Sequence, residues 1–195
     1  MEIFEYIELI ISNVMNELGV FAPILACFLL FVESILPVLP LALFITVNAY
    51  YLGSFIGFIS SYIITCLGCY VSFKLCKTKL KRHFDSMLEK MDQKKLKRVM
   101  KRISKLKMEQ LTTLIAIPFT PAFLVNIACG LSNIDKKKYV FSILIGKIFL
   151  IFFWQHVGLS LLESVKNPIV ILKVGLMLLG AFVVSKIVNK KYRLE

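Results

Sequence analysis

The sequence predicts an all-α integral membrane protein with an inverted repeat, in which each half is a re-entrant hairpin plus a transmembrane helix. An additional C-terminal transmembrane helix follows. Three observations support this fold: the apolar composition, the uneven distribution of charge, and two proline-rich breaks inside apolar stretches. Of the 195 residues, 58% are hydrophobic and the mean hydropathy is +0.78, whereas soluble domains have about 45–50% apolar residues. This composition excludes a disordered chain, a disulfide-rich secreted domain and an ordinary cytosolic enzyme.

The positive charges are concentrated in one segment of the chain. Residues 1–73 contain five acids and no Lys or Arg, for a net charge of −5, while residues 74–107 carry +11 and residues 108–195 carry +6. Loops rich in Lys and Arg lie on the cytoplasmic side of membranes, so we predict that the basic segment 74–108 is cytoplasmic and faces anionic headgroups. A basic block is also typical of nucleic-acid binding. No recognition module accompanies it here, and we expect no nucleic-acid partner.

The first half of the predicted repeat follows an amphipathic N-terminal helix. Residues 1–18 place acids and apolar side chains at helical spacing, which is typical of a helix at a membrane interface. Residues 19–52 form two short apolar arms around Pro37 and Pro40. Because proline interrupts a helix and each arm is shorter than a membrane span, we predict a re-entrant hairpin, with a kinked crossing helix as the alternative. Residues 53–73 are then predicted to cross the membrane.

The second half of the predicted repeat begins with a hairpin over residues 109–134. This segment carries no charge from residue 110 onwards, and Pro118 and Pro121 lie near its middle. Basic residues flank it on both sides, and the positive-inside rule favours both flanks in the cytoplasm. We therefore predict a second re-entrant hairpin, entering from the cytoplasmic side, and a transmembrane helix over residues 139–162.

A C-terminal transmembrane helix over residues 167–186 returns the chain to the cytoplasm. Residues 19–162 form the membrane domain, whose first hairpin enters from outside and whose second enters from inside. Inverted repeats with broken helices are typical of transporters, whose sites lie near the membrane midplane. We predict a multi-pass protein of the cell membrane with a cytoplasmic C-terminus.

Glu33 is the strongest single functional signal. It is the only acid between positions 18 and 84, and it lies just before the first proline break. An acid at membrane depth is costly unless it is neutral or paired, and burial favours its protonated form, so we expect Glu33 to carry a proton or to organise polar groups. The alternative is an acid at the membrane surface that caps a hairpin arm. Lys147 is the candidate partner, either neutralising Glu33 or attracting a lipid phosphate, and a lysine extended to the interface is its alternative.

Asn48 and Asn126 occupy equivalent places after the two breaks. A buried asparagine is hydrogen-bonded, so each of them either holds the broken backbone or meets a polar substrate. The four prolines give the breaks their shape. No hydrolase, kinase or P-loop motif is present, and the two histidines are far apart in the sequence. We expect no enzyme, no metal and no cofactor.

These residues resemble the DedA or VTT-domain membrane proteins, also called the SNARE-associated Golgi protein family. The resemblance covers roughly residues 20–160. It rests on the pattern Phe31-Val-Glu33-Ser-x-x-Pro37-x-x-Pro40 and on Ile117-Pro118-Phe-Thr-Pro121-x-x-x-x-Asn126-x-x-x-Gly130. It implies two re-entrant hairpins that face each other from opposite leaflets, with Glu33 as the hairpin acid. It also implies movement of phospholipid or undecaprenyl phosphate, with a role for the proton motive force.

The sequence departs from the family pattern at one position. Family members commonly have an arginine just before the second hairpin's Ile-Pro, but here residues 114–118 read Leu-Ile-Ala-Ile-Pro, with no base. A lipid phosphate at this place therefore lacks the usual cation, and Lys147 is the candidate substitute.

The leading functional hypothesis is a lipid translocase or scramblase for a phospholipid or a polyprenyl phosphate. Glu33, Asn48, Asn126 and Lys147 would line its substrate or proton pathway. A proton- or ion-coupled transporter of a small solute and a non-transporting membrane scaffold are the alternatives. The sequence leaves open the lipid, the direction of transport, the energy source and the oligomeric state.

Overall fold

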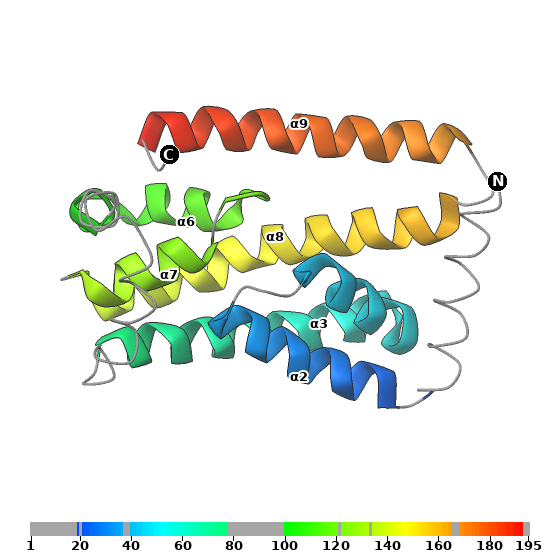
Figure 1. The fold of residues 1–195 in the computed structure, drawn as a ribbon, viewed down its shortest axis with the longest axis horizontal. Helices are drawn as coiled ribbons and strands as arrows, with labels where there is room; N and C mark the ends of the chain where they lie inside the picture. Colours follow the sequence, from blue (N-terminus) through cyan, green and yellow to red (C-terminus); the bar gives the residue numbers. More distant parts are fainter. Residues whose placement is uncertain are drawn as a thin grey trace.

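Figure 1 shows a computed structural model of the chain, which describes residues 19, 21–36, 40–77, 100–120, 122–132, 134–164 and 168–192. Within these ranges every element is a helix and there is no strand. In chain order the helices are α2 (Phe21–Ile35), α3 (Leu41–Lys77), α6 (Met108–Ala116), α7 (Ala122–Leu131), α8 (Lys136–Ser164) and α9 (Pro168–Tyr192). The expected N-terminal helix over 1–18, most of the basic segment 74–108, Pro37 and Pro121 lie outside the described residues.

The helix α3 consists of two parts joined at Gly53. This glycine has φ 78° and ψ 160°, a conformation that suits a residue without a Cβ. Eight residues of straight helix span about 12 Å, yet a Cβ on Gly57 would lie only 2.5 Å from the Cα of Ala49. The chain therefore turns back at Gly53, and the first part of α3 (residues 41–52) packs against the start of the second part (residues 54–77).

The second part of α3 and α8 run in opposite directions along the length of the molecule (Figure 1). Each carries one of the shorter helices, since α2 packs on α3 and α6 packs on α8. The helix α7 follows α6 in the chain but packs on α3. The two long antiparallel helices therefore form the frame to which the shorter ones attach.

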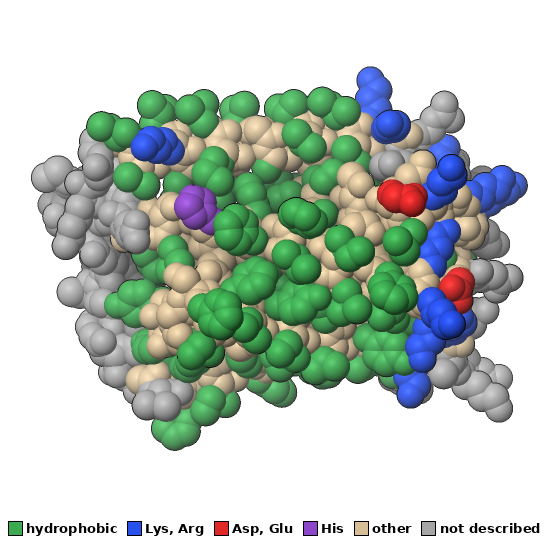
Figure 2. All heavy atoms as spheres, turned by 180° about the vertical axis from the view of Figure 1, so that it is seen from behind, with side chains coloured by type: hydrophobic (Ala, Val, Ile, Leu, Met, Phe, Trp, Pro, Cys, Tyr) green, Lys and Arg blue, Asp and Glu red, His purple; other side chains and the backbone are tan. Residues whose placement is uncertain are grey.

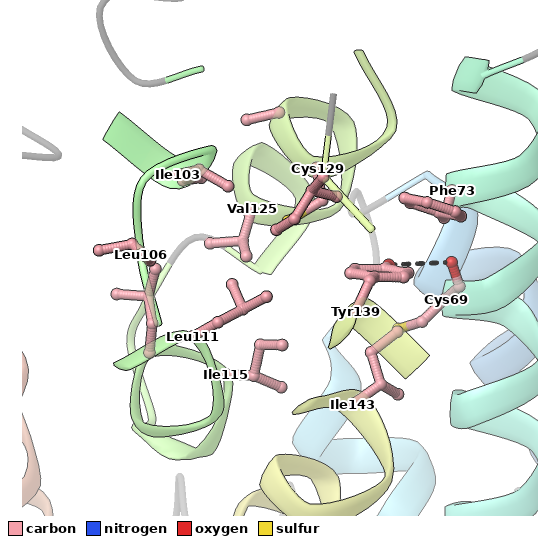
Figure 3. Close-up of a cluster of buried hydrophobic side chains, with 13 residues drawn as sticks. Cys69, Phe73, Ile103, Leu106, Leu111, Ile115, Val125, Cys129, Tyr139 and Ile143 are labelled. Carbon is pink, nitrogen blue, oxygen red and sulfur yellow. Dashed lines mark hydrogen bonds between the residues drawn. The ribbon is translucent and has the colours of Figure 1, made fainter. Parts of the chain in front are cut away.

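The main hydrophobic core lies between α3, α6, α7 and α8, around Tyr139 (Figure 3). Tyr139 is fully buried and stacks on Phe73, with the ring centroids 4.2 Å apart. Ile103 and Leu106, from the segment before α6, belong to the same core. Both residues belong to the basic segment 74–108, which is predicted to face anionic headgroups. Their own side chains pack on the protein, against the apolar side chains of α6 and α7.

Among the described residues, three helices are long and apolar enough to cross a membrane, and they overlap the expected spans: α3, α8 over Lys136–Leu162 and α9 over Leu172–Lys191. Figure 2 shows a surface suited to a protein that spans a membrane. Hydrophobic side chains cover the middle of the molecule, and Lys and Arg gather at one end. We call this the basic end. It is formed by the last turns of α3 and α9 and the first turn of α8, through Lys74, Lys77, Lys136, Lys137, Lys138, Lys190 and Lys191.

Candidate functional site

The candidate residues come from four different helices. Glu33 lies near the end of α2, Asn48 in the first part of α3, Asn126 in α7 and Lys147 in the middle of α8. The structure brings Glu33 and Lys147 within electrostatic reach of each other. Asn48 and Asn126 belong to two separate hydrogen-bond networks.

Lys147 is an almost fully buried cation, with 3% of its surface exposed. Besides Glu33, the Cys66 thiol is within its electrostatic reach. No hydrogen bond or ion pair joins Lys147 to Glu33 in the part of the chain that the structure describes. A buried charge is costly unless it is paired or hydrogen-bonded. The side-chain amine of Lys147 can therefore bind an anion or another hydrogen-bond acceptor without first breaking a contact ion pair.

Asn48 is completely buried in the angle between α2 and the two parts of α3. Its Nδ2 donates to Ser61 Oγ at 3.0 Å and lies 3.5 Å from Cys27 Sγ. Its Oδ1 accepts no hydrogen bond from the described residues. Asn48 thus ties the three helical segments together and keeps one buried acceptor available.

Asn126 is also buried, and both ends of its amide are used. Its Nδ2 lies 3.4 Å from Cys69 Sγ, and its Oδ1 lies 3.0 Å from the hydroxyl of Tyr139. The same hydroxyl lies 3.2 Å from the carbonyl oxygen of Cys69 (Figure 3). This network joins α7, α8 and α3, and its geometry is that of a structural tie.

The contacts of the two long helices repeat between the two halves of the molecule. A Cβ on Gly68 of α3 would meet the Cβ of Ser34 and the carbonyl oxygen of Phe31, and a Cβ on Gly146 of α8 would meet the Cβ of Ile115 and the carbonyl oxygen of Thr112. Ser34 and Ile115 each lie three residues before the first proline of a break, and Phe31 and Thr112 each lie six residues before it. The hydrogen bonds of Asn48 and Asn126 reach residues 61 and 139, in both cases 13 positions onward.

Several further polar atoms are buried in this region and have no hydrogen-bond partner among the described residues. They are Thr65 Oγ1, Ser72 Oγ, Thr112 Oγ1, Thr120 Oγ1 and Gln155 Oε1, in addition to Asn48 Oδ1. Buried polar groups are normally satisfied by protein or by ordered water. These oxygen atoms lie on α3, α6, α8 and the turn after α6, and each can bind an ordered water or a polar group of a ligand.

Ser61 and Gln155 also take part in these contacts, although neither was predicted from the sequence as a site residue. The amide nitrogen of Gln155 donates to the carbonyl oxygen of Ser54 at 2.9 Å, and so links α8 to α3 beside the bend at Gly53. A single Gln inside an apolar helix was a signal that could have pointed to it. Ser61 gave no such signal, because small residues are common in membrane helices.

The two proline-rich breaks are described in part. Pro40 precedes α3, and its carbonyl oxygen accepts from the amide of Leu43 at 3.1 Å. Pro118 lies in the turn after α6. There Phe119 has φ 64°, a conformation that is unfavourable for a bulky residue. Its ring contacts Trp154 of α8 edge to face, with centroids 5.4 Å apart, so the turn is anchored to the neighbouring long helix.

Comparisons with known proteins identify the family of the chain. The family model of the VTT domain matches residues 19–160. A relative from Bacillus subtilis (strain 168), described as the uncharacterized membrane protein YhjE, is 25% identical over 159 residues, which is 82% of this chain and 76% of the relative. No solved structure matches the chain.

Proposed function

Because the chain belongs to the VTT-domain or DedA family of membrane proteins, we propose that it is a lipid translocase or scramblase, acting on a phospholipid or a polyprenyl phosphate. Its polar headgroup path would lie between two re-entrant hairpins. The observation that carries the proposal is Lys147, a buried cation near Glu33 and without a contact ion pair among the described residues.

The lengths of the short helices support the hairpins. At 1.5 Å per residue, α2, α6 and α7 are about 22, 13 and 15 Å long, and each is shorter than the hydrocarbon core of about 30 Å. The end of α2 meets α3 at Gly68, and the end of α6 meets α8 at Gly146, both well inside the long helices. Arms that stop at mid-depth and turn back are re-entrant, and such backbone is tolerated where protein or a wet cavity surrounds it.

The matching contacts support an inverted repeat. The second part of α3 and α8 are antiparallel, and each holds the first arm of the preceding hairpin through a glycine at the same register. The pair formed by α2 and the first part of α3 is open at its end away from the basic end, and the pair formed by α6 and α7 is open toward it (Figure 1). This arrangement supports two hairpins of opposite orientation. Repeats of this kind place the substrate at the interface between the halves, near the midplane.

Lys147 is suited to the role of the base that residues 114–118 lack. It directly follows Gly146, which packs on Ile115 of α6, so its side chain originates next to the segment in which family members carry an arginine. A cation there stabilises a passing phosphate. Glu33 balances that charge when no lipid is present, and Asn48 Oδ1 and the unpartnered hydroxyls supply hydrogen bonds for the headgroup.

We propose further that the protein spans the cell membrane with its basic end in the cytoplasm, in line with the positive-inside rule. Anionic lipid would gather at this end before entering the path. A proton- or ion-coupled solute transporter is the second candidate, and the observation in its favour is again an acid within reach of a buried lysine.

The test is lipid movement by the purified protein in liposomes that carry a fluorescent phospholipid in both leaflets. A reductant added outside should quench well beyond half of the dye. Dye of the outer leaflet is quenched first, and dye that crosses from the inner leaflet is quenched afterwards. Lys147→Gln and Glu33→Gln should slow this second phase about tenfold, which is the effect of losing one charged hydrogen bond. Lys173→Gln, which changes an exposed lysine of α9, is the matched control and should leave the rate unchanged.

Quenching that stops near half with a phospholipid and with a labelled polyprenyl phosphate would contradict the proposal. A flux of soluble substrate driven by a pH gradient would then favour the second candidate. Full activity in both charge variants would remove Glu33 and Lys147 from the mechanism.

A further inference from the structure

A groove lies on the outer face of the molecule, between the second part of α3 and the first turns of α8. Its volume is about 350 Å³, and its walls include Leu67, Val140, Ile143 and Leu144. Ile143 is buried at its floor, whereas half of the Leu67 surface is exposed. The groove is therefore an apolar channel that opens to the surroundings of the protein, in contrast to the enclosed position of Lys147.

One end of the groove is polar and cationic. It is lined by Lys136, the first residue of α8, and by Tyr70 of α3. The Lys136 ammonium lies 5.2 Å from the centroid of the Tyr70 ring and interacts with its hydroxyl, and the Lys74 ammonium is within electrostatic reach of the same hydroxyl. These groups belong to the basic end of the molecule, so the groove runs from a cationic mouth toward the apolar middle.

We propose that this groove binds an anionic glycerophospholipid of the leaflet beside the basic end. One acyl chain occupies the apolar channel, and the phosphate is held by Lys136 and the hydroxyl of Tyr70. The volume falls in the range of small-molecule sites, about 300–1,000 Å³. The order of a charged mouth and an apolar interior matches the order of headgroup and chain in a leaflet. The complementary charge distinguishes an anionic lipid from a zwitterionic one.

A lipid explains the groove better than a soluble anion does. Exposed apolar side chains continue from the groove along both helices, such as Ile63 on α3 and Phe141 on α8, so its opening faces hydrocarbon when α3 and α8 span a membrane. A free phosphate would use only the mouth and leave the channel unfilled. The site binds lipid at rest and does not depend on the transport proposed above.

The proposal is tested by native mass spectrometry of the purified full chain with phosphatidylglycerol and with phosphatidylcholine of the same acyl chains. We expect one phosphatidylglycerol per chain, bound at least about fivefold more tightly than phosphatidylcholine, the effect of about one lysine at a membrane surface. Lys136→Gln should abolish this preference. Val140→Trp should block binding of both lipids by filling the channel, and a smaller change, Val140→Phe, serves if that variant does not fold.

Lys137→Gln is the matched control, since Lys137 is exposed on the same turn and does not line the groove. It should retain the preference for phosphatidylglycerol. Equal binding of the two lipids, or an unchanged preference in Lys136→Gln, would overturn the proposal. So would binding of glycerophosphoglycerol, which has the headgroup but no chains, with the affinity of the intact lipid, because the site would then belong to a soluble phosphate. Transport is not measured in this experiment, so its outcome is separate from that of the liposome assay.

Discussion

In the first half of the region that matches the VTT domain, Gly68 holds α2 through Ser34, and in the second half Gly146 holds α6 through Ile115. With these glycines matched, the asparagine partners Ser61 and Tyr139 match as well, each seven positions earlier. The charged residues do not match. Glu33 of the first half corresponds to an apolar leucine at position 114, and Lys147 of the second half corresponds to a cysteine at position 69.

The difference shows that the frame and the chemistry of this molecule are separable. The glycine and asparagine contacts are made twice, as expected of positions that hold the helices together. One charge comes from each half, so the candidate site exists only where the halves meet. Loss of the repeated contacts should therefore have the largest effect on stability, and changes to the unmatched charges or to a polar atom outside the repeated contacts should affect function.

The largest expected effect is on stability, from adding a methyl group at the repeated glycines. Gly68→Ala would place a Cβ 2.5 Å from the Cβ of Ser34 and 3.0 Å from a backbone oxygen, and Gly146→Ala would place one 2.9 Å from Ile115 and from a backbone oxygen. Overpacking of this kind costs about 1–3 kcal/mol. We expect a lower midpoint of thermal unfolding in detergent for both variants, with the larger fall for Gly68→Ala.

Gly175→Ala is the control, since nothing lies within 4 Å of a Cβ at that position of α9. It should leave the midpoint the same or raise it slightly, because alanine favours helix. If only one of the two glycine variants were destabilised, the two halves would not share a packing frame.

The next effect separates the two asparagines. Asn126→Leu removes both interactions of a fully used amide, and at about 0.6 kcal/mol for an average hydrogen bond in a membrane protein it should cost about 1–2 kcal/mol of stability. Asn48→Leu also breaks a tie, to Ser61, but in addition removes the unpartnered Oδ1. We expect Asn48→Leu to slow lipid movement by a larger factor than Asn126→Leu at a temperature where both proteins are folded.

Thermal unfolding and the liposome assay, applied to both variants, give the comparison. Equal loss of transport, in proportion to stability, would assign both residues to the frame. Asn48→Ser keeps a hydrogen-bonding group of smaller size and should recover part of the rate.

The sequence predicted the membrane class and the three long apolar helices. It also pointed to Lys147 as the candidate partner of Glu33, and the two residues lie within electrostatic reach of each other. These follow from composition, from segment length and from the cost of isolated charges in an apolar setting. The reversal at Gly53 lies at the predicted boundary between the segment 19–52 and the helix 53–73, and it is the geometry that a hairpin over 19–52 requires. The alternative, a kinked crossing helix, left this direction open in the sequence.

The sequence also did not predict which residues of the two halves correspond, because the spacing between matched residues changes along the chain. The first arms match at a spacing of 81 residues, as Ser34 and Ile115 show, but the later parts match at 78, as Gly68 and Gly146 show. The three extra residues lie between the first proline and the asparagine of the first half. Because the matched partners differ in chemistry, as Ser61 and Tyr139 do, a pattern search cannot align them. The contacts extend to these residues the correspondence that the proline breaks and the two asparagines indicate in the sequence.

The smallest expected effect concerns a contact that is made once. The hydroxyl of Tyr62 on α3 donates to the carbonyl oxygen of Leu144 on α8 at 2.9 Å, while the matched position in α8 is Val140, which has no hydroxyl. Tyr62→Phe should cost about 0.6 kcal/mol, the average for a hydrogen bond in a membrane protein. Tyr50→Phe, at an exposed tyrosine of the same helix, should cost less. Lipid movement should be unchanged in both, since neither hydroxyl belongs to the candidate path. A fall in unfolding midpoint for Tyr62→Phe as large as that for Gly68→Ala would mean that unmatched contacts also carry the frame, and the separation of frame from chemistry would fail.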